Sequence, residues 1–343
     1  MGVALAIYSD SCSGVRRRTF VAASGATLLV VACLARAQGQ AAPRRIGYLS
    51  AFNRVTGDLL LGTLRPELER LGWTEGRNLV FLEPRMAEGA NERLPMLAAE
   101  LVAEMPDLIL VQTVPATRAL VKATKSIPVV MVGVGTPVEL GIVADYRRPG
   151  GNVTGSSYLA DELLRKSLQL LKEAAPRLRS VAVLANLSNE AAPPMIKQMR
   201  ADAIALGMQA QIVEVTGKGD FERAFAAIRA ANTESILLPP EPLVQTNRES
   251  IAAFAQAHGL PLAVVGSSRA LPTTGLFAYG SSVVEYARVT AKYVDRILRG
   301  AKPGDLPIEQ PTRFSLVINL KAAQSLGLTI PQSMLLVADE VIQ

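Results

Sequence analysis

The sequence predicts an α/β fold made of two lobes, each built on a mostly parallel sheet. Short apolar runs alternate with amphipathic stretches from Arg44 onward, and this alternation starts again near residue 180. The apolar runs are continuous and do not alternate in polarity, which is typical of parallel strands covered by helices on both faces. Right-handed β-α-β connections then give a doubly wound layer in each lobe.

The first set of elements lies between residues 45 and 133. Strands are predicted at 45–50, 78–84, 107–113 and 127–133, and helices at 57–71, 91–105 and 115–124. Pro66 lies inside the first helical pattern, so we expect this helix to kink or to start there, because an interior proline costs about 3 kcal/mol.

The second set repeats the alternation. Strands are predicted at 180–186, 210–215, 235–240 and 260–267, and helices at 161–175, 189–206, 219–231 and 245–258. The last third departs from it, with a strand at 275–282, a helix at 285–299, an extended segment that suits a connector or edge strand, and a helix at about 320–326. We assign residues 44–153 and about 279–307 to lobe 1, and residues 154–278 and about 308–343 to lobe 2.

Gly150 and Gly151 lie where the first set ends. Two glycines relax the conformational limits of the backbone, so we predict that this pair is a hinge at which the chain passes between lobes. A plain surface turn is the alternative. A phosphate-binding loop is excluded, because neither G-x-x-x-x-G-K-[ST] nor G-x-G-x-x-G between a strand and a helix occurs in the sequence.

Residues 1–37 have the pattern of a secretory signal peptide. Three arginines at 16–18 precede an apolar run from about Thr19 to Ala35, and residues 35–37 form a small-x-small cleavage pattern. The run is shorter than the ~20 residues of a membrane span, which disfavours a transmembrane anchor. We therefore expect a periplasmic protein.

Two features of this segment leave the export route and the anchoring open. Arg17-Arg18 resembles a twin-arginine export signal, and residues 30–33 resemble a lipobox in which Cys33 would carry the lipid. We favour simple cleavage near Ala37, with a lipid anchor on Cys33 as the minority alternative.

Composition argues against several classes of function. The formal net charge is +6, but the first 37 residues hold four of the basic residues and one acidic residue, and no basic stripe with aromatics occurs, so we expect no nucleic acid. Both cysteines, Cys12 and Cys33, precede the cleavage site. The single histidine, His258, cannot build a zinc cluster, and no G-x-S-x-G accompanies a serine. We expect no metal, no cofactor and no catalytic residue.

Polar residues follow the predicted strands, and ligands of parallel α/β sheets bind beyond the carboxyl ends of strands. Thr113 precedes a helix that begins near Pro115, and helix N-termini suit a carboxylate. Glu241 or Glu139 could meet an ammonium group, and Phe52, Tyr158 and Tyr279 could form apolar walls. The candidate ligand-binding residues are Ser50, Ala51, Phe52, Thr113, Gly135, Thr136, Tyr158, Asn186, Glu241, Ser267, Ser268 and Tyr279.

Several segments carry a resemblance that covers roughly residues 44–343, among them "LGWTEGRNLVFLEPRMAEGANERLPMLAAELV", "IPVVMVGVGTPVELGIV" and "LPIEQPTRFSLVINLKAAQSLGLTIP". They resemble the bacterial ABC-transporter substrate-binding family that includes tryptophan/tyrosine-type uptake receptors. The resemblance implies the type I periplasmic binding fold, in which three crossovers join two Rossmann-like lobes and the ligand lies between them. One departure is Thr136-Pro137-Val138-Glu139, where members often carry Asp-Pro-Val-Gly, and it leaves the identity of the ligand open.

The expected function is that of a non-enzymatic solute receptor. It would bind a small solute, an amino-acid-like one among the candidates, and present it to an ABC permease in the inner membrane. The alternative is an exported sensory module whose ligand-bound form engages a receptor kinase. Both functions use the same site between the lobes, so the sequence does not distinguish between them.

Overall fold

The computed structural model describes residues 42–158, 160–267, 271–310 and 313–343. The chain divides into residues 1–42 and residues 43–343, and every feature below belongs to the second unit. The predicted signal peptide, with Cys12 and Cys33, lies outside the described residues, as does Ser268. Among the helices of the described ranges, none combines the length and the apolar character that a membrane crossing requires.

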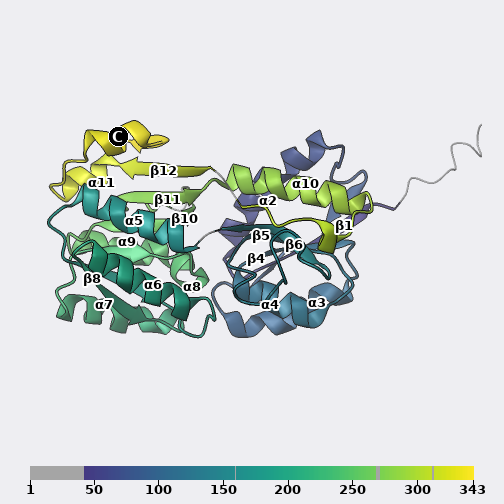
Figure 1. Ribbon diagram of the computed structural model, residues 1–343, viewed down its shortest axis with the longest axis horizontal. Helices are drawn as coiled ribbons and strands as arrows, with labels where there is room; N and C mark the ends of the chain where they lie inside the picture. Colours follow the sequence, from purple (N-terminus) through teal and green to yellow (C-terminus); the bar gives the residue numbers. More distant parts are fainter. Residues whose placement is uncertain (1–41, 159, 268–270, 311–312) are drawn as a thin grey trace, which may run out of the picture. The chain divides into compact units, whose positions relative to one another are not determined.

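The described chain forms two sheets, as predicted (Figure 1). All strand pairs of the first sheet are parallel, in the order β2-β1-β4-β5-β6 with β3 beside β1. Its strands are β1 (Arg44–Ser50), β2 (Leu79–Phe81), β3 (Arg85–Met86), β4 (Leu108–Gln112), β5 (Val129–Gly135) and β6 (Val153–Tyr158).

The second sheet has the order β13-β12-β11-β10-β9-β7-β8, and only the β11–β12 pair is antiparallel. The segment expected to be a connector or edge strand forms β12, which lies between two other strands because the chain's last strand adds beyond it. The strands of the second sheet are β7 (Ser180–Ala185), β8 (Gln209–Glu214), β9 (Ile236–Leu238), β10 (Leu262–Ser267), β11 (Phe277–Ser281), β12 (Phe314–Asn319) and β13 (Glu340–Ile342).

Helices cover both faces of the first sheet. One apolar cluster joins the sheet to α2 (Arg54–Arg70) and α10 (Val283–Leu298), and a second joins it to α3 (Leu94–Ala103) and α4 (Val114–Ala123). Since α10 comes late in the chain, the core of the first sheet includes a segment that follows most of the second sheet.

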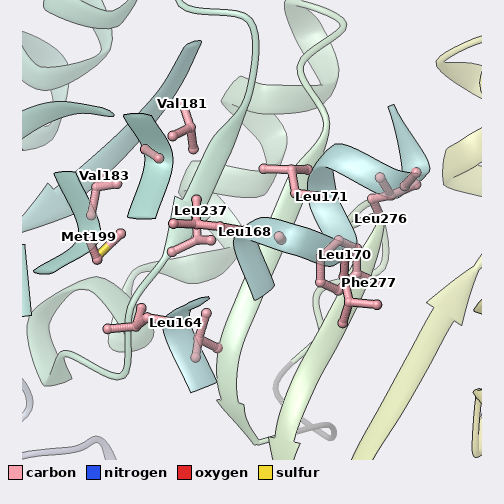
Figure 2. Packing of buried hydrophobic residues seen from close by; sticks show 14 of the residues in the cluster. Leu164, Leu168, Leu170, Leu171, Val181, Val183, Met199, Leu237, Leu276 and Phe277 are labelled. Atoms are coloured by element: carbon pink, nitrogen blue, oxygen red, sulfur yellow. The ribbon is translucent and has the colours of Figure 1, made fainter. Parts of the chain in front are cut away.

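The second sheet is covered in the same way. One cluster contains α5 (Ala160–Ala174), α6 (Ala192–Ala205), α11 (Leu320–Ser325) and α12 (Gln332–Val337), and another contains α7 (Phe221–Ala230), α8 (Pro242–Thr246) and α9 (Arg248–Ala257). Figure 2 shows part of the first cluster, in which buried side chains of α5 and α6 meet those of the sheet: Leu164, Leu168, Leu171, Met199, Val181, Val183, Leu237 and Phe277.

The chain passes between the sheets three times, as the fold class implies. It leaves the first sheet after β6, returns between β11 and α10, and leaves again between Glu309 and β12. The first sheet therefore continues to Tyr158, whereas the sequence placed a boundary at 153. Likewise β11 pairs within the second sheet, although its residues 279–281 were assigned to lobe 1.

Gly150 and Gly151 are not at a passage between the sheets, which corrects the predicted hinge. They form the turn before β6 with φ angles of 71° and 63°, and the Gly150 N–H donates to the carbonyl of Gly304 at 3.2 Å. The pair thus supplies positive φ angles where two turns of the same lobe meet closely.

A helix start at Pro66, one of the two alternatives expected there, is wrong. Helix α2 starts at Arg54 and continues through Pro66. Asn53 caps its start, because its side chain accepts from the Thr56 N–H at 3.0 Å. A proline has no N–H to donate to the carbonyl group four residues earlier, which here belongs to Gly62. Because Gly62 is exposed, water can hydrogen-bond to that carbonyl group instead.

A close approach between β5 and β6 depends on Gly155. Its φ angle is 128°, and a Cβ atom there would lie 2.2 Å from the carbonyl oxygen of Met131. The register of the β5–β6 pair shifts between Met131 and Val134, where Gly133 also has a positive φ angle. This irregular region ends at the carboxyl end of β5, beside the cavity described below.

Replacing Gly155 by alanine is expected to lower the free energy of unfolding by more than about 2 kcal/mol, because strain in φ and a backbone clash add. Gly62→Ala is the matched control. Gly62 is an exposed helical position where a Cβ atom meets nothing within 4 Å, so this change should stabilise by up to about 1 kcal/mol. Urea unfolding measures both, and a Gly155→Ala variant as stable as the parent would contradict the argument.

Candidate ligand-binding site

A cavity of about 340 Å³ lies at the carboxyl ends of strands from both sheets, a size that suits a small molecule. The first lobe contributes residues of α2, α4, α10 and the ends of β4 and β5. The second contributes residues of α5, α6, α8, α9 and the end of β10.

Six of the predicted residues line this cavity: Phe52, Thr113, Gly135, Thr136, Tyr158 and Glu241. They come from both lobes and from positions almost 200 residues apart in the chain. This agrees with the expectation that ligands of parallel α/β sheets bind beyond the carboxyl ends of the strands. Gly135 faces Tyr158 closely, since a Cβ atom at Gly135 would lie 3.2 Å from the Tyr158 hydroxyl oxygen.

The other predicted residues that the structure describes are not among those that line the cavity. Ser50 and Ala51 are completely buried, and the Ser50 hydroxyl accepts from the Phe52 N–H at 3.1 Å. Asn186 accepts from the N–H and the hydroxyl of Ser188 and holds a turn. Tyr279 packs beside the ring of Phe314, with ring centroids 6.0 Å apart. Ser267 ends β10, and Ser268 lies outside the described residues.

Thr113 is strained and incompletely bonded. It precedes α4 with φ 82° and ψ 148°, a conformation that is rare for a β-branched residue. Only 9% of the residue is exposed, yet its hydroxyl does not cap α4 and has no hydrogen-bond partner in the described chain. Its carbonyl accepts from the N–H and the hydroxyl of Thr117. Strain of this kind often marks a functional position.

Glu241 is a buried carboxyl group at the start of α8. Only 3% of the residue is exposed, and Oε2 accepts from the Val244 N–H at 2.9 Å. Oε1 is buried and has no partner among the described residues. Burial raises the pKa of Glu241 to about 7, although hydrogen bonds from the Val244 and Leu243 N–H groups act in the opposite direction.

Arg248 is a site residue that the sequence reasoning missed. It follows a break at Asn247 between α8 and α9, where the sequence predicted one helix over 245–258. Its Nη1 donates to the Gln245 carbonyl at 2.9 Å, and its buried Nε has no hydrogen-bond partner in the described ranges. Nothing in the local pattern signals the break, so the sequence offered no clue to this cation.

Three further ionisable residues that line the cavity are Glu139, Asp161 and Tyr286. The Tyr146 hydroxyl donates to Glu139 at 2.8 Å. Partial burial raises the pKa of Asp161, Arg165 lowers it, and the negative charges of Asp202 and Glu139 raise it further. Burial raises the pKa of Tyr286 to about 12. The described lining residues therefore combine one cation, several carboxyl groups and aromatic walls.

This arrangement suits a small organic ligand with charged ends and an apolar body. For metal chemistry the described residues offer no group of three or more His, Cys, Asp or Glu side chains placed to hold an ion.

Comparisons with known proteins agree with the resemblance noted from the sequence. A model of ABC transporter substrate binding proteins matches residues 60–342. A tyrosine-binding protein of Clostridioides difficile (strain R20291) is 23% identical over 267 residues, which are 76% of this chain and 74% of that protein.

Solved structures show the same fold. The ABC domain in complex with L-Trp from Streptococcus pneumonia has a TM-score of 0.80 at 24% identity, covering 88% of this chain and 100% of that one. A conserved domain protein from Vibrio cholerae O1 biovar El Tor also has a TM-score of 0.80, at 28% identity, covering 87% of this chain and 99% of that one. The predicted family and the predicted fold class are confirmed.

The pKa of Glu241 predicts a pH dependence of stability. Because the folded-state pKa of about 7 lies above the ordinary value of 4.5, the folded state holds the proton more tightly than the unfolded state. The stabilisation is complete below pH 4.5 and is lost as the pH rises to about 7, by about 3 kcal/mol in total. In Glu241→Gln this component should vanish.

The measurement is the unfolding free energy from pH 4 to pH 8 in urea, taken as the difference between wild type and variant. Glu214→Gln, at an exposed position on β8, is the control and should leave the pH profile unchanged. A wild-type profile parallel to that of Glu241→Gln would contradict the ionisation assigned to Glu241.

Proposed function

The chain belongs to the family of ABC transporter substrate binding proteins, and from this premise we propose that it binds one small solute in the cavity between its two sheets and delivers it to a membrane permease. Binding occurs without chemical turnover. The observation that carries the proposal is a cavity lined from both lobes, with buried polar atoms left without partners on each side.

The protein acts outside the cytoplasm in this proposal. The signal-peptide pattern of residues 1–37 supports export, and the permease partner then lies in the inner membrane. Cleavage near Ala37 releases a periplasmic receptor, whereas lipid attachment at Cys33 would tether the same receptor to the membrane.

The first lobe holds an acidic group of the ligand. The Thr113 hydroxyl does not cap α4 and has no partner among the described residues, and the first turn of this ten-residue helix lies beside it. Positive partial charge at a helix N-terminus and an unused hydroxyl donor together favour a carboxylate. Arg248, from the second lobe, adds a positive charge to the same cavity.

The body of the ligand is apolar. Phe52, Val55, Leu59 and Met195 line the cavity and present no polar side-chain group to it. An amino-acid-like solute fits these walls, and the relatives named above include a tyrosine-binding protein and a complex with L-Trp.

A panel of amino acids and organic acids tests the proposal by thermal unfolding of protein freed of bound ligand. At about 100 times its Kd, a ligand stabilises the folded state by about 2.7 kcal/mol, which raises Tm by several degrees. At least one acid should do so, while neutral sugars should not. Unchanged Tm with every acid would overturn the proposal.

Thr113→Val tests the acid-binding position. Valine keeps the β-branched shape and removes the hydroxyl, so binding of the responding acid should weaken roughly ten- to hundredfold with little loss of stability. Thr290→Val is the matched control, because Thr290 also has a buried hydroxyl without a partner in the described chain but does not line the cavity. Calorimetry measures both, and equal affinity in wild type and Thr113→Val would remove Thr113 from the site.

A further inference from the structure

Glu241 is the most deeply buried charged side chain of the cavity, and the fold satisfies only half of its carboxyl group. Oε2 is bonded to the start of α8, while Oε1 has no partner among the described residues. A buried carboxylate without a cation is costly, so the group is stable in the free protein chiefly in its protonated form.

Arg248 does not neutralise Glu241. Its guanidinium group donates to the Gln245 carbonyl, and its Nε lies 3.7 Å from the carboxylate of Glu249, which points to solvent with 68% of its side chain exposed. Among the described residues, burial raises the pKa of Glu241 and backbone N–H groups of its own helix lower it, and no charged side chain of the described ranges contributes. The described residues therefore offer no counter-charge to Oε1, and a cationic group of a ligand would supply one.

The other ionisable groups that face the cavity favour a cation near Glu241. Tyr158 of β6 lies close enough for the charge of Glu241 to raise the pKa of its hydroxyl, although burial contributes most. Tyr286 of α10 is neutral below its pKa of about 12, and Glu139 and Asp161 carry carboxyl groups. With Arg248 as the single cation among the described lining residues, the carboxyl groups outnumber it.

From this arrangement we infer that Glu241 selects for a protonated amine in the ligand, and that binding of the amine displaces a proton from the Glu241 carboxyl group to solvent. The inference rests on the proposed function and adds to it a regulation of ligand affinity by pH. The amine N–H group donates to Oε1, the O–H proton leaves to water or buffer, and the ligand keeps its own charge. Affinity for amine-bearing solutes is then linked to pH, whereas affinity for acids without an amine is not.

The size of the effect follows from the fraction of protein in which Glu241 is ionised. With a free-state pKa of about 7, this fraction is small at pH 5.5 and more than half at pH 7.5. Apparent affinity scales with the competent fraction, so the Kd of an amine-bearing ligand should be about ten- to thirtyfold weaker at pH 5.5 than at pH 7.5. The amine and the carboxylate of a free amino acid keep their charges over this range.

The experiment uses two matched pairs of probes, L-tyrosine with 3-(4-hydroxyphenyl)propionate and L-tryptophan with indole-3-propionate, which differ only by the amine. Calorimetry on the exported form at pH 5.5, 6.5 and 7.5 should show the stated pH dependence for the amino acid of a pair and none for its analogue. Repeating the pH 6.5 titration in two buffers of different ionisation enthalpy should reveal release of up to about one proton for the amino acid alone.

Two variants locate the effect. Glu241→Gln should remove the pH dependence of the Kd and the proton release. It should also reduce the ratio of the affinity for the amino acid to that for its analogue at pH 7.5. Glu214→Gln changes an exposed carboxylate of β8 that does not line the cavity, and it should leave both intact. Far-UV circular dichroism checks that both variants are folded.

The outcomes separate the two proposals. If an amino acid binds with the same Kd at all three pH values, or if Glu241→Gln retains the proton release, the inference fails while the proposed function stands. If Glu214→Gln removes the effect as well, the effect does not belong to the Glu241 carboxyl group and the inference is overturned. If no probe and no acid of the panel binds, the proposed function fails and the inference falls with it.

Discussion

The burial of both sheets on both faces is the constraint on which the rest of the structure depends. Helices cover each face, and the central strand residues Ile46, Leu110, Val183 and Leu237 have no exposed surface. Strands in this position can hold few polar side chains, because each buried polar group needs a partner. Polar groups with spare bonding capacity are therefore concentrated at the carboxyl ends of the strands, where the helical cover stops.

The crossovers between the sheets bring the polar strand ends of both lobes together at one site. The segments that lead into two of the three passages are bonded to each other, since the Glu309 N–H donates to the Gly155 carbonyl at 3.0 Å and the Ser157 N–H donates to the Glu309 carbonyl at 2.9 Å. Glycine makes the approach of β6 to β5 possible. The strand ends of the two sheets consequently supply opposite walls of a single cavity, and a ligand there contacts both lobes.

Two residues that line the cavity depart from the usual requirements for backbone conformation and for hydrogen bonding of buried groups. Thr113 combines a strained backbone with a hydroxyl that has no partner in the described chain, and Glu241 combines deep burial with an oxygen that is unpartnered there. Each lowers the stability of the free protein, by roughly 1–3 kcal/mol for a feature of this kind. A ligand that supplies the missing partners offsets these costs on binding, which links recognition to the energetics of the folded state.

Much of this could be predicted from the sequence alone. The continuous apolar runs indicated parallel sheets, the restart near residue 180 indicated two lobes, and long segments near the C-terminus indicated the family. Thr113 and Glu241 were found because a polar residue that directly follows a buried strand must lie at a strand end. That inference needs only local sequence.

The remainder depended on contacts between distant segments. Strand β6 was missed because it carries Thr154 and Ser156, whose burial is possible only through bonds to the Leu306 carbonyl and the Gly133 N–H. Arg248 was missed because its place in the cavity follows from a break between α8 and α9 at Asn247, where the sequence pattern predicted one continuous helix. Local sequence indicates where the apolar strands end, whereas the tertiary structure decides which strand ends face each other, because long-range crossovers and not neighbouring residues bring them together.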